Sequence, residues 1–156
     1  MLRPGRRHDR SAGFTLVEVL LVLAILGVLA AIALPSYSKY RDRAMVAQAV
    51  NDIAGMNVQL RQYITENHVV APDLSAIGAA GKLDPWGNAY VYVDLAVAGV
   101  GGARKDKNLV PINTDFDLYS KGKDGASALP ITAATSRDDV ILADDGKFIG
   151  LASEYQ

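Results

Sequence analysis

The chain contains no cysteine, so no disulfide can close any part of it. It has only two histidines, His8 and His68. The Gly-x-Ser-x-Gly elbow, the P-loop and the Gly-x-Gly-x-x-Gly fingerprint, which mark common hydrolases and nucleotide-binding enzymes, are all missing. Carboxylates are plentiful, but no pattern pairs an acid with a base in a cleft. Together these absences argue against an enzyme.

Basic residues are scarce beyond the first thirteen positions. The whole chain has 16 basic and 17 acidic residues and a net charge of −1. Four of those basic residues (Arg3, Arg6, Arg7 and Arg10) but only one acidic residue (Asp9) precede Phe14, so the chain from Phe14 onward carries a net charge of −4. A nucleic-acid-binding protein needs a basic face. Nucleic acid is therefore not expected to be the main partner.

A long apolar run extends from Phe14 to Leu34, and Glu18 is its only charged residue. About 20 apolar residues suffice to cross a bilayer as a helix. The arginines in front of the run are expected to stay on the cytoplasmic side, because basic flanks resist translocation. The sequence therefore predicts one membrane crossing, with Ser36 to Gln156 outside the cytoplasm.

The start of this run carries a specific motif. The segment Gly13-Phe14-Thr15-Leu16-Val17-Glu18 resembles the class III signal of type IV pilins and type II secretion pseudopilins. An ordinary secretory signal is cut after its apolar region, whereas here the small residue Gly13 precedes it. The resemblance implies that a prepilin peptidase cuts between Gly13 and Phe14, that Phe14 is N-methylated, and that the apolar segment is retained.

The same resemblance divides the chain into three parts. It implies a leader peptide over residues 1–13, a transmembrane and assembly helix over 14–35, and a periplasmic globular domain over 36–156. A carboxylate inside a membrane span is costly and usually functional. In the resembling family the partner of Glu18 is the free amine of Phe14 in the neighbouring subunit. The alternative is that Glu18 lies near the helix end and reaches the membrane surface.

Beyond the apolar run, the helical period continues to about Asn67. Apolar residues recur there at spacings of three and four, which predicts one apolar stripe on a helix. The stripe consists of Val46, Ala49, Val50, Ile53, Met56, Leu60, Tyr63 and Ile64. The sequence therefore predicts one long helix from about Phe14 to Asn67, whose second half packs on a globular domain.

The rest of the chain shows short alternating segments and turn signals, which favour a small antiparallel sheet. The predicted elements are a helical turn over 73–77, a strand over 89–93 that 95–97 extends, a loop over 99–108, a strand over 115–120, a loop over 122–136, and a hairpin of 139–143 and 148–151 that turns at 144–146. The predicted fold class is α+β, with the long helix laid on a small antiparallel sheet as in pilins.

Two later motifs resemble the major pseudopilin of type II secretion, namely Asp84-Pro85-Trp86-Gly87-Asn88-Ala89-Tyr90 and the segment 115–125. In that family a loop after the second motif binds structural calcium in place of the pilin disulfide. The resemblance implies side-chain ligands at Asp124 and at one or both of Asp138 and Asp139, with the carbonyl of Lys121 contributing. Oxygen ligands of this kind suit Ca²⁺. The alternative is that these are solvated loop carboxylates.

These features predict a structural subunit of a pseudopilus, a periplasmic filament. In a type II secretion system, such a filament drives folded exoproteins through the outer-membrane channel. The expected partners are further copies of the chain, the prepilin peptidase, minor pseudopilins, the inner-membrane assembly platform and the membrane. Two alternatives remain open: a type IV pilin or minor pilin for adhesion, motility or DNA uptake, and a single-span membrane-anchored domain that binds a ligand through Trp86 and the acidic loop.

Overall fold

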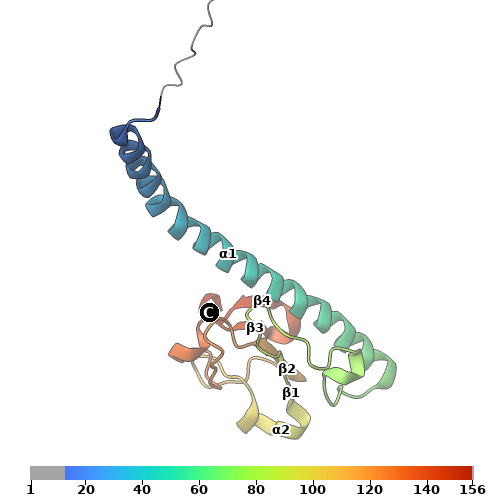
Figure 1. Ribbon diagram of the computed structural model, residues 1–156. Coiled ribbons are helices and arrows are strands. Elements are labelled where there is room, and N and C mark those ends of the chain that lie inside the picture. The colour runs from blue at the N-terminus through green and yellow to red at the C-terminus, as the bar shows by residue number, and fades with distance from the viewer. Residues whose placement is uncertain (1–12, 156) are drawn as a thin grey trace, which may run out of the picture. The chain divides into compact units, whose positions relative to one another are not determined.

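The computed structural model describes residues 13–155 (Figure 1). These residues belong to two units divided between Tyr40 and Arg41. The predicted leader therefore lies outside the described residues except for Gly13. In chain order the elements are α1 (Leu16–Asn67), η1 (Leu74–Ile77), β1 (Val91–Asp94), α2 (Leu95–Gly102), β2 (Phe116–Ser120), η2 (Ala134–Ser136), β3 (Val140–Ala143), η3 (Asp144–Gly146), β4 (Phe148–Leu151) and η4 (Ala152–Glu154).

The long helix is confirmed as α1, which begins at Leu16 and ends at Asn67. It is long and apolar enough to cross a membrane. Within the first unit, every large apolar side chain from Phe14 to Leu34 is between 46% and 78% exposed. Such a continuous apolar surface needs lipid or other protein to cover it.

The second unit contains a four-stranded antiparallel sheet in the order β1-β2-β3-β4. Its register pairs Tyr92 with Leu118 and Ile141 with Gly150. The predicted hairpin and its turn at Asp144–Gly146 are confirmed as β3, η3 and β4. Together with α1, this sheet confirms the α+β fold class.

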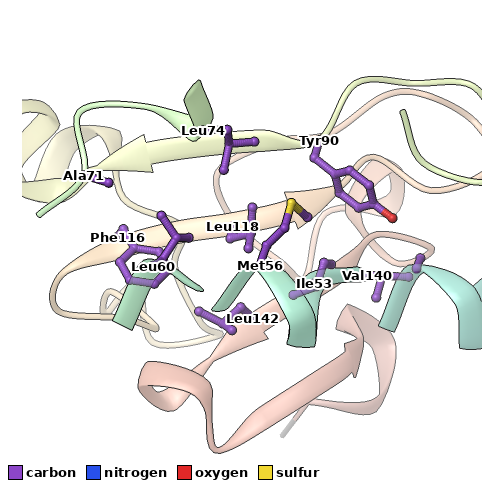
Figure 2. Packing of buried hydrophobic residues seen from close by; sticks show 11 residues of the cluster. Ile53, Met56, Leu60, Ala71, Leu74, Tyr90, Phe116, Leu118, Val140 and Leu142 are labelled. Carbon is purple, nitrogen blue, oxygen red and sulfur yellow. The ribbon is translucent and has the colours of Figure 1, made fainter. Parts of the chain in front are cut away.

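The main core lies where the second half of α1 packs on one face of the sheet (Figure 2). Ile53, Met56 and Leu60 of α1 are no more than 2% exposed, and they point toward Leu118 and Leu142 of the sheet. These three helical residues belong to the stripe that the sequence predicts. Burial of a side chain of this size contributes roughly 1.5–3 kcal/mol, so the stripe holds this part of α1 on the sheet.

The other face of the sheet covers a smaller core. Ile141 and Ala143 of β3 pack there with Ile112, Ile131 and Ala152. Since Val140 and Leu142 belong to the main core, all four residues of β3 are buried. This explains why β3 reads Val-Ile-Leu-Ala without a polar alternation.

The segment after β1 differs from the prediction. We expected 95–97 to extend the strand and 99–108 to be a loop, but Leu95–Gly102 forms the short helical segment α2, which is interrupted at Gly99, where the φ angle is 63°. Asp94 causes this change, because its carboxylate caps the helix by accepting a hydrogen bond from the backbone N–H of Ala96 at 2.8 Å. Residues 103–108 lie outside the helices and strands, as predicted. The strand itself begins at Val91, while Ala89 forms only an isolated bridge to Leu83.

Candidate functional site

The start of α1 is fixed by a reciprocal pair of hydrogen bonds between Thr15 and Glu18. The hydroxyl of Thr15 accepts from the backbone N–H of Glu18 at 3.2 Å, and the Glu18 carboxylate accepts from the backbone N–H of Thr15 at 3.5 Å. This is a capping box, which ends a helix on its N-terminal side. Gly13 and Phe14 therefore precede the helix, and Phe14 is 78% exposed. The predicted cleavage position thus lies in an open, non-helical segment.

The role of Thr15 was missing from the sequence prediction, although the pattern Thr-x-x-Glu is its signal. The capping box also gives Glu18 a partner within its own chain. The predicted pair between Glu18 and the Phe14 amine of a neighbouring subunit stays a prediction.

The two motifs that resemble the major pseudopilin lie against each other in the second unit. The Asp84 carboxylate accepts from the backbone N–H of Trp86 at 3.0 Å, from that of Asn88 at 2.8 Å, and from the Ser120 hydroxyl at 2.5 Å. The Asn88 amide donates to the carbonyl of Gly122 at 3.0 Å. The turn after Asp84 therefore positions the segment that leads into the predicted calcium loop.

Asp138 lies against the start of that loop, close to Asp124. The Asp138 Oδ2 atom accepts from the backbone N–H of Lys123 at 2.9 Å and from that of Asp124 at 3.1 Å. The Asp124 carboxylate itself accepts from the backbone N–H of Ala126 at 2.8 Å. The contact between the Asp138 carboxylate and the backbone of Asp124 is thus the part of the predicted ligand set that the fold brings together.

Asp139 has a different environment. It is 0% exposed, and its Oδ2 atom accepts from Arg104 at 2.7 Å and from the Ser127 hydroxyl at 2.6 Å. Among residues 13–155, no group of three or more histidine, cysteine, aspartate or glutamate side chains converges as a metal site would require. Of the two predicted alternatives for the further side-chain ligand, Asp139 pairs with Arg104, whereas Asp138 lies against the backbone of Asp124. Calcium binding at Asp124 and Asp138 stays a prediction.

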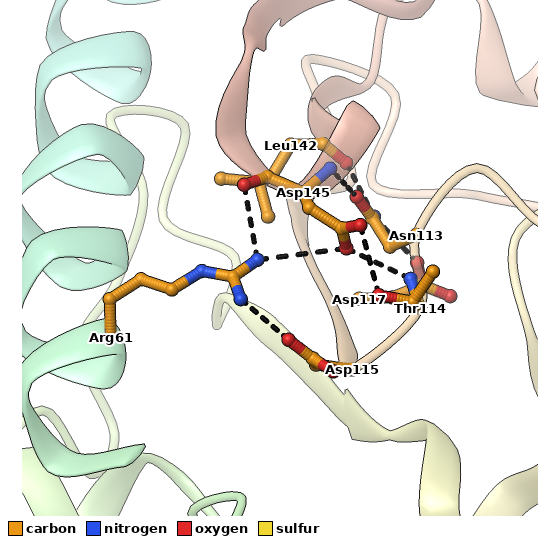
Figure 3. Close-up of polar contacts among 7 residues, drawn as sticks. All are labelled: Arg61, Asn113, Thr114, Asp115, Asp117, Leu142 and Asp145. Carbon is orange, nitrogen blue, oxygen red and sulfur yellow. Dashed lines mark hydrogen bonds and ion pairs between the residues drawn. The ribbon is translucent and has the colours of Figure 1, made fainter. Parts of the chain in front are cut away.

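A second polar cluster ties α1 to the sheet (Figure 3). Arg61 reaches from α1 and contacts Asp115, just before β2, with 2.5 Å between Nη1 and Oδ2. Its Nη2 atom donates to the carbonyl of Asp145 at 3.1 Å, in the turn between β3 and β4. The guanidinium also lies 5.1 Å from the centre of the Phe116 ring. Arg61 therefore joins three segments that are distant in the sequence.

The same cluster holds the turn between β3 and β4 in place, and the pKa values of two of its carboxyl groups are shifted. Burial favours the protonated form of Asp145, but hydrogen bonds from Thr114 and the charge of Arg61 outweigh it and hold the Asp145 pKa below its usual value. Burial raises the pKa of Asp117, although the backbone N–H of Arg104 and the Asn113 amide donate to it. The Asn113 amide also donates to the carbonyl of Leu142 at 2.8 Å. These contacts are structural, and they hold the C-terminal half of the chain together without a disulfide.

Comparison with known proteins supports the interpretation of the N-terminal segment. The family profile described as "Prokaryotic N-terminal methylation motif" matches residues 8–34. The chain is 33% identical to the type II secretion system core protein G of Escherichia coli K12, over 77% of this chain and 87% of that protein. It is 29% identical to protein G of Pseudomonas aeruginosa, over 76% of this chain and 88% of that protein. No solved structure matches the chain.

Type IV pilins match at a similar level. The chain is 30% identical to the major pilin PilE of Neisseria gonorrhoeae, over 86% of each chain. With a long helix on an antiparallel sheet and a methylation motif at its start, the chain belongs to the pilin and pseudopilin family. Membership implies processing by a prepilin peptidase and self-assembly into filaments. The relatives are structural proteins, and this chain is likewise a structural protein rather than an enzyme.

Proposed function

We propose that the chain is a structural subunit of the periplasmic pseudopilus of a type II secretion system. In this role, mature copies leave the inner membrane and stack their N-terminal helices into a filament. The growing filament then drives folded exoproteins through an outer-membrane channel. The minor pseudopilins and the inner-membrane assembly platform are the further partners of the proposed filament.

The apolar surface of the first unit is the observation that carries this proposal. Every large apolar side chain from Phe14 to Leu34 is exposed, and the only charge among them is Glu18. In the membrane, lipid covers this surface. In a filament, neighbouring helices replace the lipid, and repeated contacts between unlike faces generate an open fibre. An unpaired carboxylate in that interior would be costly, so each Glu18 needs a cationic partner.

The proposed partner of Glu18 is the amine of Phe14 in the adjacent subunit, which sets the register of the stack. That amine exists only after the peptide bond between Gly13 and Phe14 is cut. Cleavage is therefore proposed to be required for assembly as well as for maturation. The position of Gly13 and Phe14 before the helix supports cleavage there, because a protease needs access to the backbone of its substrate.

The similarity to protein G of two bacteria favours the secretion role, while the similarity to PilE favours a type IV pilin as the second candidate. Deleting the gene in its host, with re-expression of the wild-type chain as control, distinguishes them. The proposed function predicts loss of specific secreted proteins while surface fibres and motility remain. Loss of fibres, twitching or DNA uptake with normal secretion would contradict it and make the chain a pilin.

A further inference from the structure

Arg104 is a buried cation in the second unit. The residue is 1% exposed and follows α2 in the connection between β1 and β2. Its Nη2 atom donates to Asp139 at 2.7 Å, and its Nη1 atom donates to the Ser127 hydroxyl. The guanidinium also lies 4.2 Å from the centre of the Tyr119 ring. A buried arginine is tolerated only where its charge and its N–H groups find partners, and Arg104 has both.

One hydrogen-bond donor of Arg104 and one acceptor of Asp139 remain unpaired at this contact. Asp139 Oδ1 and Arg104 Nε are both buried, and neither has a hydrogen-bond partner within the described part of the chain. Nε and Nη2 lie on the same edge of a guanidinium, and that edge fits the two oxygens of one carboxylate. Nε and Oδ1 are thus the donor and the acceptor that would complete a two-pronged arginine–carboxylate pair, of which the structure forms the hydrogen bond between Nη2 and Oδ2. The guanidinium thus matches the negative charge of Asp139, although the Oδ1 atom of Asp139 accepts no hydrogen bond among the described residues.

The backbone of Arg104 extends the same set of contacts. Its N–H donates to Asp117 of β2 at 2.6 Å, and its carbonyl accepts from the N–H of Ile112 at 3.0 Å. Ser127, in the loop before β3, donates its hydroxyl to Asp139 at 2.6 Å. Arg104 thus joins the connection between β1 and β2, the strand β2, and the loop that leads into β3. These are the segments that a disulfide or a metal would otherwise have to hold.

We propose that Arg104 is the built-in cation of this region and occupies the structural role that the resemblance assigns to calcium at Asp139. A divalent cation on Asp139 would lie beside the buried guanidinium, and like charges repel strongly where water is excluded. Asp138, the neighbouring predicted ligand, already accepts two backbone N–H groups through one oxygen. We therefore expect the C-terminal half of the chain to fold without calcium, whereas calcium binding at Asp124 and Asp138 would make its stability depend on calcium. The proposal holds whether the filament serves secretion or a type IV pilus.

Thermal melting of the full chain in detergent tests this proposal. The wild type, Arg104→Gln and Arg137→Gln are each melted with excess calcium and with excess chelator, with circular dichroism as the readout. Arg137 is the matched control, because it is an exposed arginine close to Asp138 in the sequence. We expect the wild type to melt at the same temperature with calcium and with chelator. We expect Arg104→Gln to lower the melting temperature by about 10 °C or more, since it leaves a buried carboxylate unpaired.

Arg104→Lys keeps the experiment decisive if Arg104→Gln does not fold. Lysine retains the charge but not the planar fork, so we expect a melting temperature below that of the wild type and no gain on adding calcium. A wild-type melting temperature that rises with calcium and falls with chelator would overturn the proposal. An Arg104→Gln protein that melts at the same temperature as Arg137→Gln would also overturn it.

Discussion

Gly122 is the residue at which the backbone of the predicted calcium loop turns against Asp138. Its φ angle is 63°, in the left-handed region that glycine adopts most readily. A Cβ atom added there would lie 2.3 Å from the carbonyl oxygen of Asp138 and 2.7 Å from its Oδ2 atom. The close approach of these two segments therefore depends on the absence of a side chain, whether or not calcium binds beside them.

Gly122→Ala tests this dependence on a single residue. We expect it to lower the free energy of unfolding by about 3 kcal/mol, because backbone strain and a steric clash add together. Gly78→Ala is the matched control, since Gly78 has a φ angle of 70° but nothing within 4 Å of the added Cβ, and we expect it to cost about 1 kcal/mol. Equal effects in urea unfolding would mean that the contact with Asp138 is unimportant.

The turn between β3 and β4 combines an unusual backbone conformation with an ion pair to α1. Asp144 and Asp145 both have positive φ angles, of 51° and 55°, which non-glycine residues rarely adopt without support. Asp145 has that support, because Thr114 donates to it through both its backbone N–H and its hydroxyl at 2.9 Å. Arg61 adds its charge from α1. The turn is thereby linked to the helix.

This link makes part of the stability depend on pH. The Asp145 pKa is lower in the folded chain than in the unfolded chain, so its contribution is present above about pH 4 and is lost as the pH falls through the folded pKa. Between about pH 5 and pH 3, we expect the free energy of unfolding to fall less in Asp145→Asn than in the wild type. The difference between the two decreases is expected to be under about 1 kcal/mol, because the Asp145 side chain is partly exposed. Glu154→Gln, at an exposed position, is the control for removing one negative charge. Identical acid unfolding curves for the wild type and Asp145→Asn would contradict this account.

The elements differ in how far the sequence could predict them. α1 and the hairpin of β3 and β4 are confirmed because each has a strong local signal, the apolar stripe for the helix and the Asp-Asp-Gly turn for the hairpin. α2 was wrongly assigned because Leu95–Gly102 contains no polar residue and hence no period. Only the cap at Asp94 distinguishes it from a strand.

The polar contacts of the second unit could not be predicted from local patterns. Arg61 contacts Asp115 across 54 positions of the sequence, and Arg104 contacts Asp139 across 35. Nothing near Arg104 in the sequence marks it as buried, because the glycines of α2 precede it and Lys105 and Lys107 follow it. Asp138 and Asp139 are neighbours with different partners, which a sequence pattern does not reveal. The predicted ligand set therefore treats as equivalent two carboxylates that the fold separates.

The two units of the chain differ in how their apolar surface is covered. The second unit has its own core, and two arginines tie its segments together. The first unit presents an apolar helix whose large side chains are exposed, and such a surface needs lipid or neighbouring protein to cover it. The chain thus combines a self-contained globular unit with a helix that depends on its surroundings, as expected for a subunit that moves from a membrane into a filament.

Filament yield from Glu18→Gln tests whether the chain assembles through the ion pair between Glu18 and the Phe14 amine of a neighbouring subunit. Glutamine retains an oxygen that can accept the N–H of Thr15 in the capping box, but it removes the charge that would pair with the Phe14 amine. We expect the variant to be cleaved between Gly13 and Phe14, as mass spectrometry of its N-terminus would show. We also expect it to yield at least about tenfold fewer filaments than the wild type or Glu154→Gln, since the lost pair is worth more than 1.4 kcal/mol. Normal filament yield from processed Glu18→Gln would contradict assembly through this ion pair.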